Sequence, residues 1–256
     1  LNYENIHFEN RTLSTTVSRS EIDVTAKLGN FSFVNPVCVA NMKSVQDWSL
    51  LKLFDSAGVM YSKHRIDGTE EVFQFCKFAK ENDFRVLSIS IGVKEEWVRF
   101  LHRIKRENIY PDFLTLDLAN AYNVNIIEIS REVYRLFPNS FYIVGNGMTK
   151  EFIEWLENIP QTRVDAAKIG IGNSLACRTK HETGYSSSTI SHLDECSSAA
   201  KRLKIIADSG LSIIDNKVSI GDVSKAIRFG ADFLWSGSIW SRCSDNPAAK
   251  TGRYFG

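Results

Sequence analysis

The sequence lacks the marks of several classes of protein. No apolar run approaches the roughly 20 residues that cross a bilayer, and we find no signal-peptide pattern at the start. The 31 Lys and Arg residues nearly balance the 30 Asp and Glu residues, so the formal net charge is +1. The five cysteines are odd in number and form no CxxC pair, which argues against a disulfide framework or a metal site. These absences predict a cytoplasmic protein with no nucleic-acid or membrane partner.

One rhythm repeats along the chain. Short apolar runs rich in β-branched and aromatic residues alternate with amphipathic stretches of helical period. Strands are predicted at 37–40, 59–62, 85–91, 113–118, 141–144, 167–171, 204–207 and 232–235. Helices are predicted at 70–80, 95–107, 124–137, 150–157, 191–202 and 222–229. This alternation favours a (β/α)8 TIM barrel over an open doubly wound sheet.

The barrel is expected to form one domain over residues 1–256, with 1–34 as an N-terminal capping segment. Only about twenty residues follow the last predicted strand, which is too few for an eighth outer helix of ordinary length. We therefore expect either a truncated chain or a partner subunit that covers the exposed apolar surface.

The segment 168–179 is the most informative part of the chain. An apolar strand runs into a loop that carries Gly170 and Gly172, and Cys177 and Thr179 follow. Barrel active sites form in the loops after the strands, and glycines let backbone amides approach an anion closely. An isolated cysteine is most often a small buried hydrophobe. Polar residues at the other strand ends favour a nucleophile here instead.

Each of the other seven predicted strands contributes a pair of residues, most of them polar or glycine, in or just after the strand. In strand order they are Asn41 and Met42, Lys63 and His64, Ser88 and Ser90, Asp117 and Asn120, Gly145 and Asn146, Asp208 and Gly210, and Gly237 and Ser238. Each alone is a common turn former or strand-end cap. Glycines after the last two strands are typical of the phosphate site of barrels, and a carboxylate such as Asp208 accepts hydrogen bonds from sugar hydroxyls. Together they predict a sugar phosphate or a nucleotide as ligand.

These residues resemble the family of inosine-monophosphate (IMP) dehydrogenases and guanosine-monophosphate (GMP) reductases. The resemblance covers nearly the whole chain. Its most specific motifs are Ala40-Asn41-Met42, Asp117-Leu118-Ala119-Asn120, the cysteine loop through Thr183-Gly184, and Ala207-Asp208-Ser209-Gly210. The resemblance implies the reductase branch, because Ala-Asn-Met, Lys63-His64 and Asp-x-Ala-Asn all look reductase-like. The Gly237-Ser238 pair looks like the dehydrogenases instead.

The resemblance also implies an activity and roles for individual residues. The activity is NADPH-dependent reductive deamination of GMP to IMP and ammonia by a homotetramer. Cys177 would form a covalent purine intermediate, and Thr179 would help protonate the leaving group. The implied substrate contacts are Met42, Gly170, Gly172, Ser174, Asp208, Gly210, Gly237 and Ser238. The implied cofactor contacts are Lys63, Ser88, Ser90, Asp117 and Asn120.

Departures from the family pattern keep two alternatives open. Lys43 stands where the family has Asp, and Leu175 stands where the family has its phosphate-binding serine. The family's flap, with its catalytic glutamate, would follow Gly256. One alternative is therefore an NAD-dependent IMP dehydrogenase, and the other is a degenerate barrel that binds a nucleotide without turnover. A modified purine substrate and a monovalent-cation requirement also stay open.

Overall fold

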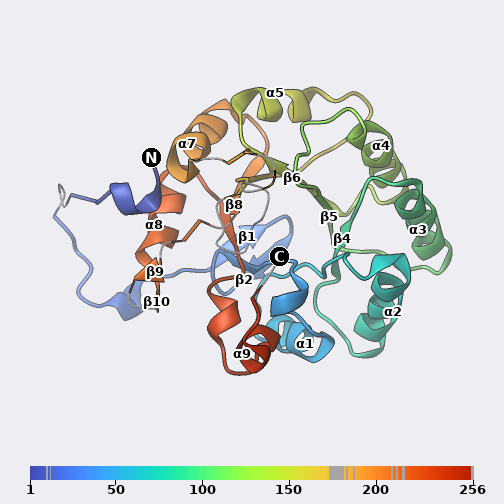
Figure 1. The fold of residues 1–256 in the computed structure, drawn as a ribbon, viewed down its shortest axis with the longest axis horizontal. Helices are drawn as coiled ribbons and strands as arrows, with labels where there is room; N and C mark the ends of the chain where they lie inside the picture. Colours follow the sequence, from blue (N-terminus) through green and yellow to red (C-terminus); the bar gives the residue numbers. More distant parts are fainter. Residues whose placement is uncertain are drawn as a thin grey trace.

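The computed structural model describes residues 1–256 except 10, 12, 173–181, 183, 187, 209, 212, 215–216 and 255–256. Its centre is a parallel sheet of seven strands in the order β3-β11-β8-β7-β6-β5-β4. These are β3 (Val37–Val39), β4 (Ser88–Ile91), β5 (Phe113–Asp117), β6 (Phe141–Gly147), β7 (Ala166–Ile169), β8 (Lys204–Asp208) and β11 (Phe233–Ser236). Figure 1 shows the sheet curled upon itself with the helices outside.

Residues 59–63 close the gap between β3 and β4. Tyr61 forms a parallel bridge with Val39, and Lys63 forms one with Ile89. Gln46 stabilises this closure, because its side-chain amide donates to the backbone carbonyls of two neighbouring strand ends, Ala40 and Ser62, at 2.8 Å each. The predicted α/β barrel is therefore confirmed, with one correction. The second predicted strand pairs through single bridges and does not form a continuous ladder.

Helices cover the outside of the sheet. They are α1 (Trp48–Ser56), α2 (Gly68–Glu81), α3 (Glu95–Arg106), α4 (Ile126–Leu136), α5 (Lys150–Asn158), α7 (Thr189–Ala199), α8 (Gly221–Arg228) and α9 (Pro247–Thr251). Six of them match the predicted helices, and α1 and α9 were not predicted. The α1 helix is short, and it begins where the side chain of Asp47 accepts a hydrogen bond from the Leu50 amide at 2.7 Å.

The segment after β11 packs beside α1 (Figure 1). It contains the 3-10 turn η4 (Trp240–Arg242) and the short helix α9. The Trp240 ring lies 5.0 Å from the ring of Phe54 on α1, and its indole nitrogen donates to the carbonyl of Cys38 on β3. These residues therefore pack against α1 and β3. They follow β11, after which the sequence predicts no outer helix.

A small hairpin closes the amino-terminal end of the barrel. It consists of β1 (Ala26–Leu28) and β2 (Phe31–Phe33), which pair in antiparallel fashion. Leu28 and Phe33 are buried among the inward-facing residues of the sheet, including Phe113 and Phe233, which begin β5 and β11. This interior core is separate from the larger core between the sheet and the helices. Apolar side chains therefore fill the interior at the amino-terminal end. The charged side chains Asp117, Lys168 and Asp208 lie at the opposite end.

The remaining elements are short. They are the 3-10 turns η1 (Tyr3–Asn5), η2 (Arg19–Glu21) and η3 (Lys43–Val45), and the two-stranded sheet of β9 (Ile213–Ile214) and β10 (Lys217–Val218). Within the described residues, no helix is long and apolar enough to cross a membrane.

Candidate active site at the carboxyl end of the barrel

A buried ammonium group holds together two carboxylates from different strands. The Nζ of Lys168 on β7 lies 3.0 Å from Oδ1 of Asp117, which ends β5, and 3.3 Å from Oδ2 of Asp208, which ends β8. The Lys168 side chain is only 3% exposed, whereas Asp117 and Asp208 are 26% and 19% exposed. The lysine therefore lies beneath two carboxylates that face the mouth of the barrel.

Two further side chains complete this cluster. The Asn146 amide donates to Oδ2 of Asp208 at 2.5 Å and to the carbonyl of Gly170 at 2.6 Å. Arg65 donates to the backbone carbonyl of Asp117 at 2.9 Å. Within the described part of the chain, Oδ1 of Asp208 has no hydrogen-bond partner. This oxygen can accept a hydrogen bond from a ligand hydroxyl.

The ion pairs decide the protonation of the cluster. Burial raises the pKa of Asp117, but the charges of Lys168 and then Arg65 outweigh it, so the pKa lies below its ordinary value. Burial lowers the pKa of Lys168, but Asp208 and Asp117 outweigh that effect and raise it. At neutral pH, Asp117 is therefore an ionised acceptor and Lys168 is a cation.

A second polar cluster follows residues 59–63. The Nζ of Lys63 lies 3.0 Å from Nε2 of His64 and 3.5 Å from a carboxylate oxygen of Glu71 on α2. Burial, followed by the charge of Lys63, lowers the pKa of His64 to about 4, so its imidazole is neutral at pH 7. Its Nδ1 atom is buried without a hydrogen-bond partner among the described residues.

Lys43 belongs to the same region. Its ammonium group pairs with Asp67, just before α2, at 2.7 Å. This hydrogen bond lowers the pKa of Asp67. The lysine that stands where the family has Asp is therefore compensated by a nearby carboxylate and does not add an unpaired charge to the mouth.

Ser88 and Ser90 lie inside the barrel rather than at its mouth. Both are fully buried on β4. Ser90 accepts a hydrogen bond from the Asn41 amide at 3.0 Å and lies 3.0 Å from the Ser62 hydroxyl. Asn41 in turn accepts from the indole of Trp235 at 3.0 Å. Neither serine side chain is exposed in this structure, and their predicted contact with a cofactor stays a prediction.

The carboxyl ends of β3 and β11 bring two predicted substrate residues, Met42 and Gly237, together. At Gly237, an added Cβ would lie 2.8 Å from Sδ of Met42 and 2.7 Å from Oη of Tyr254. Gly237 thus permits close approach of these side chains, which a larger residue would push apart. Ser238 follows directly, and its hydroxyl lies 3.4 Å from that of Ser236.

Residues 173–181 of the cysteine loop lie outside the described residues. Gly170 and Gly172 have φ angles of 131° and 75°, which favour glycine because a Cβ would clash with the backbone. Ser174, Cys177 and Thr179 lie outside the described residues. Gly210 is described after β8, and Asn120 is exposed after β5, where its side-chain oxygen accepts from the Tyr122 amide at 3.1 Å.

Sequence reasoning missed Lys168, Asn146 and Arg65 as site residues. A signal for Lys168 was present, because a charged residue inside the apolar run Ala166-Ala167-Lys168-Ile169 is almost never buried without a partner. Asn146 was noted at the end of a predicted strand but was given no role, and Arg65 is an ordinary polar loop residue with no comparable signal.

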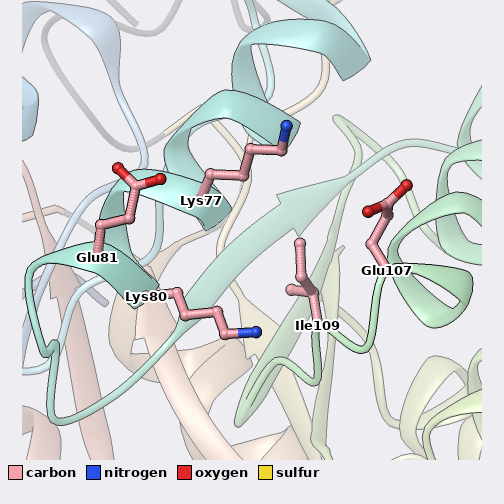
Figure 2. Close-up of a pocket in the computed structure, with 5 residues that line it drawn as sticks. All are labelled: Lys77, Lys80, Glu81, Glu107 and Ile109. Carbon is pink, nitrogen blue, oxygen red and sulfur yellow. The ribbon is translucent and has the colours of Figure 1, made fainter.

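A pocket elsewhere on the surface is unrelated to this cluster. It is lined by Lys77, Lys80, Glu81, Glu107 and Ile109. Figure 2 shows Lys77, Lys80 and Glu81 on the last turns of α2, and Glu107 and Ile109 in the segment that follows α3. Two lysines and two glutamates balance its charge. In the described ranges, no group of three His, Cys, Asp or Glu residues is arranged to hold a metal ion.

The fold is an α/β barrel with a polar cluster at the carboxyl ends of its strands, the end at which barrels of this kind bind their ligands. A family model described as "IMP dehydrogenase / GMP reductase domain" matches residues 2–254. The chain therefore belongs to the IMP dehydrogenase / GMP reductase family.

Individual relatives agree with this assignment. A protein named GMP reductase from Staphylococcus saprophyticus is 36% identical over 90% of this chain and 67% of its own length. A GMP reductase from Helicobacter pylori is 34% identical over 88% of this chain and 66% of its own length. The crystal structure of inosine 5'-monophosphate dehydrogenase from Legionella pneumophila is 25% identical, covers 93% of this chain and 68% of its own, and has a TM-score of 0.75. The chain thus spans about two thirds of the length of these relatives.

Proposed function

We propose that the protein is a purine-nucleotide oxidoreductase that catalyses the reductive deamination of GMP to IMP and ammonia with NADPH. The observation that carries this proposal is the set of relatives named GMP reductase, 34–36% identical over 88–90% of the chain. The reductase-like Ala40-Asn41-Met42 motif at the end of β3 supports it. Residues 1–256 are proposed to act as one domain with 1–34 as its capping segment, in the cytoplasm and as a homotetramer.

The proposed chemistry centres on Cys177. Its thiolate attacks C2 of the guanine base, a sulfur–carbon bond forms, and the C2–N bond breaks to release ammonia. Thr179 helps to deliver the proton that the leaving group needs. The cofactor, when bound, would supply a hydride to C2. The sulfur–carbon bond then breaks, which releases IMP and regenerates the Cys177 thiolate. Covalent attachment thus divides one difficult displacement into two easier steps.

Asp208 and the glycines after the strands are proposed to bind the nucleotide. Oδ2 of Asp208 is occupied by Lys168 and Asn146, which leaves Oδ1 for a ribose hydroxyl. Gly170, Gly172, Ser174, Gly210, Gly237 and Ser238 are proposed to hold the phosphate and the base with Met42. Backbone amides at such glycines approach an anion closely.

The neighbouring groups fit a nicotinamide cofactor. Its riboside presents hydroxyls and a carboxamide, and the site offers an ionised Asp117 and the exposed Asn120. We propose that Lys63, Asp117 and Asn120 hold this cofactor. Burial lowers the pKa of Lys63, while Glu71 and Asp67 partly oppose that effect. We propose NADPH rather than NADH as the cofactor. The sequence leaves a monovalent-cation requirement open.

NADPH oxidation at 340 nm with GMP tests the activity directly, using the full-length gene product. We expect oxidation with one ammonia released per NADPH consumed. The Cys177→Ala variant should lose at least about a thousandfold in kcat, because the covalent route is gone, yet should still bind GMP. Turnover that survives the substitution would contradict the role of Cys177.

The second candidate is the opposite reaction, NAD-dependent oxidation of IMP. The Gly237-Ser238 pair and the likeness to the Legionella pneumophila dehydrogenase favour it. NADH formation from IMP without NADPH oxidation by GMP would select this candidate. GMP binding with neither activity would select the barrel without turnover.

A further inference from the structure

Lys168 occupies an unusual position for a charged side chain. It lies in the middle of β7, where its backbone pairs with Gly145 of β6 on one side and Ile206 of β8 on the other. Its neighbours in β7 are all buried. A buried lysine without partners would cost several kcal/mol in lost hydration, so its two carboxylate partners are needed for the fold to tolerate it.

The neighbouring strand provides space for this side chain. A Cβ at Gly145 would lie 2.4 Å from Cβ of Lys168, which is closer than two carbon atoms can approach. On the other side, the Lys168 ammonium lies 5.2 Å from the centre of the Trp235 ring, a cation–π contact. The strand pairing and the interior ring therefore both accommodate an extended lysine that points toward the mouth.

The two carboxylates that Lys168 joins serve different ligands in the proposed reaction. Asp208 faces the nucleotide substrate, and Asp117 faces the cofactor. They lie on strands separated by β6 and β7 in the sheet. Lys168 is the described residue whose side chain contacts both of them.

We propose that Lys168 is a positioning residue that couples the substrate and cofactor sites by holding Asp208 and Asp117 on one ammonium group. This inference rests on the proposed function, because it takes the ligands of the two carboxylates from that function. Lys168 touches neither ligand, and it acts by fixing the direction of both acceptors and the charge of Asp117.

Loss of the ammonium group has a specific consequence. Two partly buried carboxylates would then share a site without their common cation, and each would repel the other. The pKa of Asp117, now held down by Lys168 and Arg65, would rise. Since a ribose hydroxyl donates to the ionised form, cofactor affinity would weaken as the pH falls from 8 to 6. A lysine that only supported the fold would not create this pH dependence.

The test measures dissociation constants by calorimetry for GMP and for NADPH separately, at pH 6 and pH 8, with no turnover required. For Lys168→Met we expect both constants to rise at least about tenfold, and that for NADPH to rise further at pH 6. Lys168→Arg should restore a flat pH profile. Lys225→Met is the matched control, since Lys225 also pairs with a buried carboxylate, Asp222, but on α8. It should leave both constants unchanged.

Asp208→Asn keeps the inference testable if Lys168→Met does not fold. Altering the substrate-side carboxylate should change the NADPH dissociation constant at least about threefold, because Lys168 is then paired with Asp117 alone. A change confined to one ligand in either variant, or a pH-independent loss, would overturn the coupling. A wild-type enzyme that turns over GMP while both variants bind normally would overturn this inference alone. A wild-type enzyme that binds neither nucleotide would overturn the proposed function and the inference with it.

Discussion

Carboxylates stand at both ends of the barrel strands, and their partners differ. At the amino-terminal end, Asp112, Asp165 and Asp232 each precede a strand and accept a hydrogen bond, at 2.8–2.9 Å, from a backbone amide in the neighbouring strand or directly before it. Asp165 and Asp232 also pair with nearby cations of the surface, Arg163 and Lys204. At the carboxyl end, Asp117 and Asp208 pair with the side chain of Lys168. The first group joins strand to strand through backbone amides, whereas the second is held by one buried ammonium group. The same residue type is structural at one end and, in the proposed function, binds the ligands at the other.

The interior shows the same division. The amino-terminal half is filled by rings, with Phe33 6.0 Å from both Phe113 and Phe233. The carboxyl half is filled by hydrogen-bonded polar groups such as Asn41 and Ser90. Apolar burial stabilises in proportion to area, whereas a buried polar group gains little net free energy and requires a partner. Stability and binding should therefore be separable by substitution at the two ends.

The largest expected effect on stability is at the apolar end. Phe33→Ala removes a buried ring that packs on both sheet and hairpin, so we expect the free energy of unfolding to fall by about 3–5 kcal/mol. GMP affinity should not change, because the mouth is untouched. Urea denaturation and calorimetry measure the two quantities. Phe8→Ala is the control, since Phe8 is 54% exposed. A large loss of GMP affinity in Phe33→Ala would show that the two ends are not separable.

A matched pair of aspartates sharpens the comparison. Asp208→Ala should weaken GMP binding by about 1.5–3 kcal/mol, the usual cost of losing a charged hydrogen-bond partner. Asp232→Ala, at the amino-terminal end of the adjacent strand, should instead lower the unfolding free energy by about 1–3 kcal/mol, because the Ile205 amide loses its acceptor. Its GMP dissociation constant should equal that of the wild type. Equal effects of both changes on binding would contradict the division.

The last expected effect is the contribution of His64, at the polar end, to the pH dependence of the unfolding free energy. The folded pKa of His64 is lowered to about 4, whereas an unfolded histidine titrates near 6.5. Between these values the unfolded chain binds a proton that the folded chain does not, so stability falls as the pH falls. From pH 7 to pH 5 this group costs about 2 kcal/mol. Urea midpoints at both pH values should show His64→Gln losing that part of the slope. The surface variant His102→Gln should keep it, and an unchanged slope in His64→Gln would refute the assignment.

Much of the fold could be predicted from local patterns. Short apolar runs rich in β-branched and aromatic residues located every strand of the sheet, because parallel strands are buried on both faces. Amphipathic stretches of helical period located six helices, because burial on one face leaves a repeating signal. The helix α1 was not predicted. The bridges at Tyr61 and Lys63 escaped because pairing length depends on the neighbouring strands and not on the propensity of the segment itself.

The site was predictable only in part. Strand-end residues such as Asp117 and Asp208 were found because barrels gather the loops after their strands at one end. Ser88 and Ser90 were assigned by the same rule; the structure buries both of them, and their contact with a cofactor stays a prediction. Cys177 and Thr179 remain predictions of the sequence, outside the described residues.

The sequence by itself determined the alternation of strands and helices, the polar residues at each strand end and the motifs of the family. Only the tertiary structure decided which of those polar groups form ion pairs and hydrogen bonds with one another. Asp117 and Lys168 are 51 residues apart, and Asn146 and Asp208 are 62 apart. No local pattern encodes these pairs, because their distances follow from the closure of the sheet and the register of β5 to β8. That register brings one ammonium group beneath two carboxylates.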